Sequence, residues 1–133
     1  MTATFSVMCI EDNAMLVDAL ERLLALEPDF GGMHRVADYA RVTSEAVAHD
    51  PSLILLDLHL PGGLDGLTVL DELLSTLPGA RVIIFSGDPR GDVAAKALSR
   101  GAWGFVSKGV LPERLVRAMR EVLSGEAVVA LGS

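Results

Sequence analysis

Short apolar runs alternate with longer stretches of helical periodicity along almost the whole chain. Such alternation indicates βαβ units, in which helices connect the strands of a parallel sheet. The run Leu53–Leu56 is the most hydrophobic, so we expect it at the centre of the sheet, buried on both faces. The sequence predicts an α/β fold with five strands, at Phe5–Ile10, Met33–Ala37, Leu53–Leu56, Val82–Phe85 and Gly104–Ser107.

The stretches between these runs carry start and stop signals of helices. Asp12 or Asn13 can cap a first helix that continues to about Leu26. Leucines spaced by three and four positions give Gly66–Leu77 one hydrophobic face. The remaining helices are expected at Thr43–His49, between Pro89 and Gly101, and from Pro112 to a cap at Gly125.

Composition and charge narrow the possible classes of function. The chain has 133 residues, half of them hydrophobic and 22% charged, as expected for one globular domain. No apolar stretch approaches the roughly 20 residues that span a bilayer, and the N-terminus lacks a signal-peptide pattern. The single cysteine, Cys9, excludes a disulfide framework, so we expect a cytoplasmic protein without membrane contact. A net charge of −7 argues against direct binding of DNA, which needs clustered lysine and arginine.

Polar residues stand at the ends of four apolar runs. Glu11 and Asp12 follow the first run, and Asp57, Ser86 and Lys108 come at the ends of later ones. In open parallel sheets the carboxyl ends of the strands form the ligand site, so we expect these side chains to form one site. Carboxylates, a hydroxyl and a lysine suggest metal-assisted phosphoryl transfer to a carboxylate, with Asp57 as the nucleophile. Three carboxylates need positive charge beside them, and a divalent cation such as Mg²⁺ together with Lys108 provides it.

Five short segments occur in a specific order over about Phe5–Gly125. They are Glu11-Asp12, Asp57 with Pro61 four residues on, Asp65-Gly66, Ser86-Gly87, and Gly104-Phe105-Val106-Ser107-Lys108. Together they resemble the receiver domain of bacterial response regulators, which act in two-component signal transduction. The segment from Pro112 to Glu126 is similar to the NarL/LuxR class, in which a helix-turn-helix DNA-binding domain usually follows the receiver.

The resemblance implies a flavodoxin-like fold, a (βα)5 three-layer sandwich with strand order 2-1-3-4-5. Residues 1–125 would be the receiver, and residues 126–133 the start of a linker to an output domain absent from this chain. Transcription regulation through DNA would then belong to that other domain. The protein would be a signalling phosphoacceptor, capable of self-phosphotransfer and autodephosphorylation, and not an enzyme acting on an external metabolite.

The resemblance also implies roles for individual residues. A sensor histidine kinase would phosphorylate Asp57, with Lys108 and Ser86 assisting the transfer. Mg²⁺ would be held by Glu11, Asp12, Asp57 and the backbone carbonyl of His59. In the switch that follows, Ser86 would move toward the phosphate and Phe105 would rotate into the space it leaves. The expected outcome is a changed surface around the fourth helix and the fifth strand and helix, read by a partner or by a second copy in a homodimer.

The chain departs from the family's pattern at two places, and the first of them, a longer loop, keeps a pseudo-receiver open as an alternative. Three residues, Gly62–Leu64, separate Pro61 from Asp65 where the family usually has two, and Lys108 is followed by glycine in place of proline. The role of Trp103, in packing or in partner contact, also stays open.

Other classes of function fit the sequence less well. A haloacid-dehalogenase-type aspartyl phosphatase would carry Asp-x-Asp at the nucleophile, whereas this chain has Asp57-Leu58-His59. A flavodoxin-like FMN carrier would need a phosphate-binding loop after the first strand, where Glu11 and Asp12 would repel phosphate. His34, His49 and His59 lie in different predicted elements without ligand-like spacing, which does not favour a zinc site.

Overall fold

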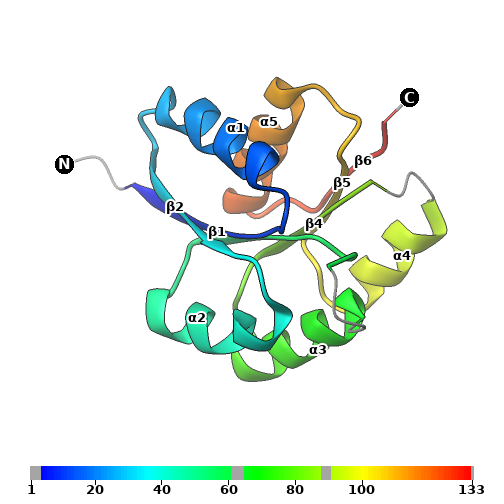
Figure 1. The fold of residues 1–133 in the computed structure, drawn as a ribbon. Helices are drawn as coiled ribbons and strands as arrows, with labels where there is room; N and C mark the ends of the chain where they lie inside the picture. Colours follow the sequence, from blue (N-terminus) through cyan, green and yellow to red (C-terminus); the bar gives the residue numbers. More distant parts are fainter. Residues whose placement is uncertain (1–3, 61–64, 88–90, 133) are drawn as a thin grey trace.

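The computed structural model describes residues 4–60, 65–87 and 91–132, and within them six strands form one parallel sheet (Figure 1). The expected order 2-1-3-4-5 is confirmed, and a sixth strand extends the sheet beyond β5. The strands are β1 (Phe5–Ile10), β2 (Phe30–Val36), β3 (Leu53–Leu56), β4 (Val82–Ser86), β5 (Gly104–Ser107) and β6 (Val128–Ala130).

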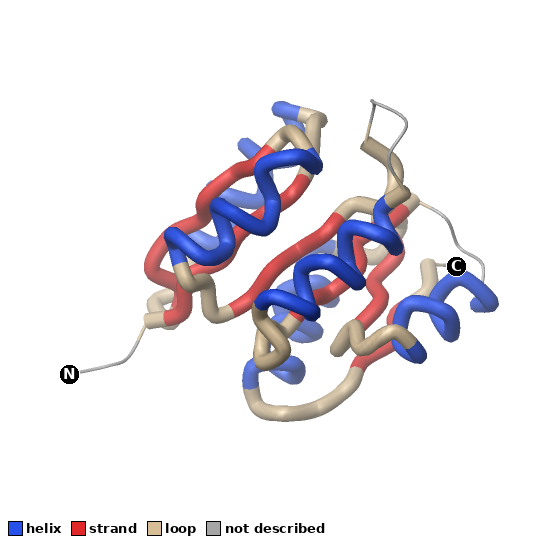
Figure 2. The backbone as a smooth tube through the Cα atoms, turned by 90° about the horizontal axis from the view of Figure 1, so that it is seen from below, coloured by secondary structure: helices blue, strands red, loops and turns tan. Residues whose placement is uncertain are grey.

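Helices cover both faces of the sheet, which gives the three layers of a flavodoxin-like fold (Figure 1). On one face lie α1 and α5, and on the other lie α2, α3 and α4, which Figure 2 shows from below in front of the strands. The helices are α1 (Ala14–Ala25), α2 (Val42–His49), α3 (Gly66–Thr76), α4 (Gly91–Ser99) and α5 (Pro112–Leu123), with a 3-10 helix η1 (Tyr39–Arg41) before α2. No helix within the described ranges has the length and apolar character to cross a membrane.

The strand β3 lies inside the sheet, as its unbroken apolar sequence predicts. All four of its residues are buried. Alternate side chains point to opposite faces, so Leu53 and Leu55 pack in the layer with α1 and α5. Ile54 and Leu56 pack in the layer with α2, α3 and α4. Asp57 therefore follows a strand that is fixed from both sides.

The strand β6 lies in the segment expected to begin a linker. It pairs in parallel with β5, with Val128 beside Gly104 and Ala130 beside Val106. Val128 and Ala130 are buried, and the Val128 amide donates a hydrogen bond to the Trp103 carbonyl at 3.1 Å. A side chain at Gly104 would place a Cβ 3.1 Å from the Val128 carbonyl oxygen, so glycine permits this close approach. The described residues thus form one strand more than the five expected from the sequence.

The strand β2 begins earlier than expected, because Gly31 and Gly32 form part of the strand and do not turn the chain. The register between β1 and β2 shifts between Phe5 and Ser6. Gly32 has a φ of 151°, a conformation that favours glycine and accommodates the irregularity.

The helix signals in the sequence correspond to caps in the structure. Asn13 caps α1 by accepting hydrogen bonds from the amides of Met15 and Leu16, at 3.1 and 3.2 Å. Pro112 begins α5, and Gly125 has a positive φ just after that helix ends. The expectations for Pro61–Leu64 and Pro89 fall outside the described residues.

Trp103 packs against its own domain. The Arg81 guanidinium carbon lies 4.8 Å from the centre of the Trp103 ring. The same guanidinium donates to the carbonyls of Val122 and Leu123 at the end of α5, at 2.6 and 2.8 Å. Trp103 is therefore part of the contact that joins β4 and β5 to the end of α5.

Candidate functional site

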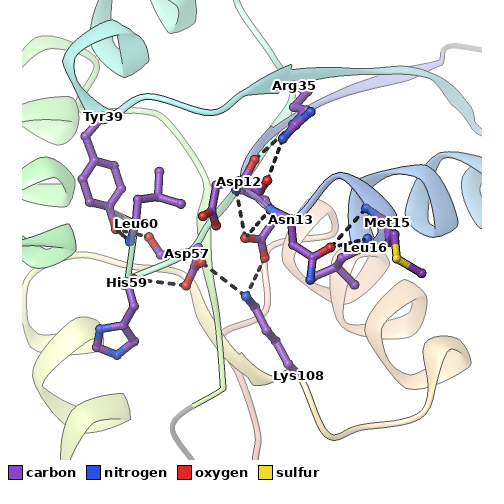
Figure 3. Close-up of polar contacts among 11 residues, drawn as sticks. Asp12, Asn13, Met15, Leu16, Arg35, Tyr39, Asp57, His59, Leu60 and Lys108 are labelled. Atoms are coloured by element: carbon purple, nitrogen blue, oxygen red, sulfur yellow. Dashed lines mark hydrogen bonds and ion pairs between the residues drawn. The ribbon is translucent and has the colours of Figure 1, made fainter. Parts of the chain in front are cut away.

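Acidic side chains meet where β1 and β3 end side by side in the sheet (Figure 3). Glu11 and Asp12 directly follow β1, and Asp57 directly follows β3. The Asp57 amide donates to the Ile10 carbonyl at 3.1 Å, which continues the strand pairing up to the site. One oxygen from each of the three carboxylates lies within 4.8 Å of the others.

Lys108 completes this cluster from the loop after β5. Its Nζ donates to Glu11 Oε1 at 2.5 Å and to Asp57 Oδ2 at 3.3 Å. Burial lowers the pKa of Lys108, but the hydrogen bond to Glu11 and the charges of Asp57 and Glu11 outweigh it, so the net pKa is raised. The ammonium is therefore charged at neutral pH and offsets part of the negative charge around it.

Glu11 is the most tightly held of the three acids, with only 2% of its surface exposed. Its Oε2 accepts hydrogen bonds from the amides of Asp12 and Asn13, at 3.0 and 3.4 Å, while Oε1 faces Lys108. Asp12 is exposed, so its carboxylate borders solvent. Oxygen ligands of this kind, in a cluster this small, fit a hard divalent cation such as Mg²⁺.

Tyr39 ties the backbone of Asp57 to η1. The Tyr39 hydroxyl donates to the Asp57 carbonyl at 2.5 Å and accepts from the Leu60 amide at 3.3 Å. Burial raises the pKa of Tyr39 to about 12, so the hydroxyl keeps its proton. No sequence signal identified Tyr39, because an isolated aromatic residue before a helix has many roles.

Arg35 holds the backbone of the acidic pair from the edge strand β2. Its Nε donates to the Glu11 carbonyl at 3.1 Å, and its Nη2 donates to the Asp12 carbonyl at 2.8 Å (Figure 3). The expected strand order already placed the end of β2 beside the end of β1. An arginine there was a signal that the sequence interpretation missed.

His59 approaches the site through its backbone. Its amide donates to Asp57 Oδ1 at 3.1 Å, and its exposed imidazole points away from Asp57 (Figure 3). This arrangement agrees with a role that does not involve the His59 side chain.

Ser86 and Phe105, the expected switch residues, are both completely buried. Ser86 ends β4, and its carbonyl accepts the Lys108 amide at 2.8 Å, which links it to the site through the backbone. Phe105 lies beside Ile84 in the core that α2, α3 and α4 cover. Any rotation of Phe105 would thus start from a buried ring.

Cys9 is the second-to-last residue of β1, and its thiol is not reactive. The side chain is buried, and burial raises the pKa of its thiol to about 12. A protonated and inaccessible thiol is a poor nucleophile and a poor metal ligand.

Comparison with known proteins places these features in a family. The family model for the response regulator receiver domain matches residues 7–120. The nitrate/nitrite response regulator protein NarL of Escherichia coli K12 is 32% identical over 125 residues, which cover 94% of this chain and 57% of that protein. The DNA-binding transcriptional activator DevR/DosR of Mycobacterium tuberculosis is 26% identical, over 92% of this chain and 56% of that protein. The chain thus spans a little over half the length of these relatives.

Solved structures agree with these sequence matches. A LuxR-family two-component response regulator from Aurantimonas superposes with a TM-score of 0.88 at 26% identity, covering 95% of this chain and 89% of that one. The receiver domain of the putative response regulator NarL from Mycobacterium tuberculosis gives 0.84 at 26% identity, covering 93% and 99%. With the matching fold and the family model, these similarities lead to one conclusion: the chain belongs to the response regulator receiver domains, in the NarL/LuxR class.

Proposed function

We propose that this receiver accepts a phosphoryl group on Asp57 from the phosphohistidine of a sensor histidine kinase. The observation that carries the proposal is the environment of the Asp57 carboxylate. It is 5% exposed, its Oδ2 lies 3.3 Å from the Lys108 ammonium, and it shares a small cluster with Glu11 and Asp12. A signalling function of this kind fits the family, whose members are not enzymes acting on metabolites.

The transfer requires alignment and neutralisation of charge more than covalent help. An Asp57 oxygen attacks the phosphorus, the bond to the donor's imidazole nitrogen breaks, and an acyl phosphate forms. The His59 amide and the Tyr39 hydroxyl fix the carboxylate and its backbone for this attack. Lys108 exchanges its contact with Asp57 for a phosphoryl oxygen, while its short bond to Glu11 keeps it in place.

Mg²⁺ is the proposed cofactor, and it would supply positive charge beside the phosphoryl oxygens when bound. Asp12, Asp57 and the His59 backbone carbonyl would hold it directly, with Glu11 contributing partly through water. Arg35 supports these ligands by holding the backbone carbonyls of Glu11 and Asp12. This contact fixes the backbone from which the two carboxylate side chains extend.

Ser86 and Phe105 are the proposed switch. The Ser86 hydroxyl would hydrogen-bond a phosphoryl oxygen, and movement of Ser86 would change the packing of Phe105, which lies on the neighbouring strand. The surface formed by α4, β5 and α5 would change with it and favour a homodimer. Regulation of transcription would proceed through a DNA-binding domain that these residues do not include.

Treatment with acetyl phosphate or phosphoramidate and Mg²⁺, followed by intact mass measurement, tests the proposed phosphorylation site. We expect one base-labile phosphate adduct on the wild type and none on Asp57→Asn. Asp18→Asn is the matched control, because Asp18 is an exposed acid of α1 paired with Arg22, and it should be phosphorylated like the wild type. A folded wild type that binds Mg²⁺ and takes no adduct would identify a pseudo-receiver instead.

Size-exclusion chromatography with and without beryllofluoride tests the proposed dimer. We expect a larger species for the wild type with beryllofluoride and no change for Asp57→Asn. An unchanged wild type that binds beryllofluoride would rule out dimerisation of this domain as the output.

A further inference from the structure

A second cluster of possible metal ligands lies between the edge strand β2 and the helix α2. It consists of His34 on β2 together with Glu45 and His49, which are four residues apart on α2. His34 lies two residues before Val36, so both side chains point to the face that α2 covers. The helical spacing of Glu45 and His49 places both side chains on one side of α2. The packing of β2 against α2 therefore brings together two histidines that the sequence gave no reason to pair.

The two imidazoles converge on a single carboxylate oxygen. Glu45 Oε2 lies 3.1 Å from Nε2 of His34 and 3.1 Å from Nε2 of His49. The rings are stacked, with centres 3.8 Å apart and planes inclined by 23°. Both ring nitrogens thus lie beside the same carboxylate oxygen.

Arg41 fixes the orientation of Glu45. Its Nη2 contacts the other carboxylate oxygen, Oε1, one helical turn before Glu45. Oε2 is thereby left to the histidines. A partner on the far oxygen is the arrangement by which proteins orient a ligating carboxylate.

We propose that His34, Glu45 and His49 bind a divalent transition-metal ion of the zinc type. Bonds of about 2.0–2.1 Å to a tetrahedral zinc place neighbouring ligand atoms roughly 3.3 Å apart. The observed nitrogen–oxygen separations of 3.1 Å are close to that value, and binding further requires the stacked imidazoles to rotate until both Nε2 lone pairs point at the ion. Two histidines and a glutamate are also a donor set that zinc uses when a fourth position stays open.

Space for a fourth ligand is present beside the cluster. A pocket of about 200 Å³ is lined by both histidines and by residues at the start of β1 and β2. Water or a small anion can reach the histidines through it. Mg²⁺ is a poor match here, because it prefers an all-oxygen set and several retained waters.

A metal ion at this position would fasten β2 to α2 close to the phosphorylation site. Arg35, which holds the Glu11 and Asp12 carbonyls, is adjacent to His34 on β2. Tyr39, which holds the Asp57 carbonyl, lies in η1 just before α2. The metal would thus restrain β2, which carries Arg35, and α2, which directly follows the 3-10 helix that carries Tyr39.

Calorimetric titration with Zn²⁺ in excess Mg²⁺ tests the proposal, because the Mg²⁺ proposed above would then compete with Zn²⁺ for the acidic cluster. We expect one equivalent of Zn²⁺ to bind the wild type, and at least tenfold weaker binding by His34→Ala, His49→Ala and Glu45→Gln. His59→Ala is the matched control: it removes the remaining histidine of the sequence, lies outside the cluster, and should bind Zn²⁺ within twofold of the wild type. Asp57→Asn should bind as tightly as the wild type, which separates this site from the phosphorylation site.

A second measurement keeps the test decisive where a variant does not fold. In the wild type, Zn²⁺ should shift the ring nitrogen resonances of two of the three histidines, and excess Mg²⁺ should not. Unchanged Zn²⁺ affinity in all three cluster variants, or ring resonances that do not respond to Zn²⁺, would overturn the proposal. Failure here leaves phosphorylation of Asp57 untouched, because the intact-mass experiment does not involve these residues.

Discussion

The Tyr39 hydroxyl donates a hydrogen bond of 2.5 Å to the backbone carbonyl of Asp57. The two residues belong to separate βα units, so this contact fixes the position of Asp57 from outside its own strand and loop. The same hydroxyl accepts the Leu60 amide, which makes it a bridge between the two ends of the segment after β3.

Replacing Tyr39 by phenylalanine keeps the ring and removes this bridge. We expect the free energy of unfolding to fall by about 1–3 kcal/mol, because a buried carbonyl and a buried amide lose their partner. Equilibrium unfolding in urea measures the change. Ser99→Ala is the control, since it removes an exposed hydroxyl that donates to the Lys96 carbonyl at 2.7 Å, and it should cost less than about 0.5 kcal/mol. Equal effects of the two substitutions would contradict the assigned role of Tyr39.

Removing one charge from the acidic cluster should stabilise the metal-free protein. Asp12→Asn relieves repulsion among Glu11, Asp12 and Asp57, and a gain of about 0.5–1 kcal/mol is expected for this exposed residue. Mg²⁺ should raise the melting temperature of the wild type, because it binds the folded state, and should raise that of the variant much less. Thermal unfolding with and without Mg²⁺ measures both effects, with Asp18→Asn as the control. Equal stabilisation of wild type and Asp12→Asn by Mg²⁺ would remove Asp12 from the ligand set.

The two faces of β6 allow a matched test of its packing. Val128 is 5% exposed and Val129 is 46% exposed, although they are neighbours in one strand. Val128→Thr buries a hydroxyl and should lower the free energy of unfolding by about 1–2 kcal/mol, whereas Val129→Thr should change it by less than about 0.5 kcal/mol. Urea unfolding of the two variants gives the comparison. If both substitutions were silent, β6 would not contribute to the folded domain in solution.

The pair Asp29 and Arg120 should give the protein a defined sensitivity to acid. Arg120 donates to both Asp29 oxygens, at 2.9 and 2.8 Å, and these hydrogen bonds hold the pKa of Asp29 below its usual value of 3.8. A lowered pKa in the folded state means that the stabilisation is present above pH 3.8 and is lost as the pH falls through the folded-state pKa.

Asp29→Asn should therefore cost about 0.5–1 kcal/mol near neutral pH and progressively less as the pH falls below about 4. Urea unfolding over this range of pH measures the difference. In an Arg120→Met background the same substitution should have little effect at any pH, because the partner that shifts the pKa is gone. A cost that persists unchanged at low pH would show that Asp29 stabilises the fold by some other means.

Much of the fold follows from local patterns in the sequence. The apolar run at Leu53–Leu56 and the helix signals at Asn13 and Pro112 depend on neighbouring residues, and the structure has the corresponding elements there. The strand β6 has three residues, too few to show an alternating pattern, and its pairing with the edge of β5 is a tertiary contact. The early start of β2 was hidden by Gly31 and Gly32, which usually indicate a turn.

The residues of the candidate site also fall into two groups: those that the sequence could predict and those that depend on tertiary contacts. Glu11, Asp57 and Lys108 could be predicted, because each follows an apolar run and parallel strands end at a common edge. Tyr39 and Arg35 act through backbone carbonyls of distant residues, and no spacing in the sequence records such contacts. The pairing of His34 with His49 likewise depends on how β2 packs against α2.

The position of β6 has a consequence for how other proteins can recognise this domain. Without it, the outer side of β5 would present unpaired amides and carbonyls, which can accept a strand from another polypeptide. With β6 in place, β5 is paired on both sides, and within the described residues the three-residue β6 is the edge of the sheet on this side. A polypeptide that added a strand here would therefore pair with β6 and not with β5.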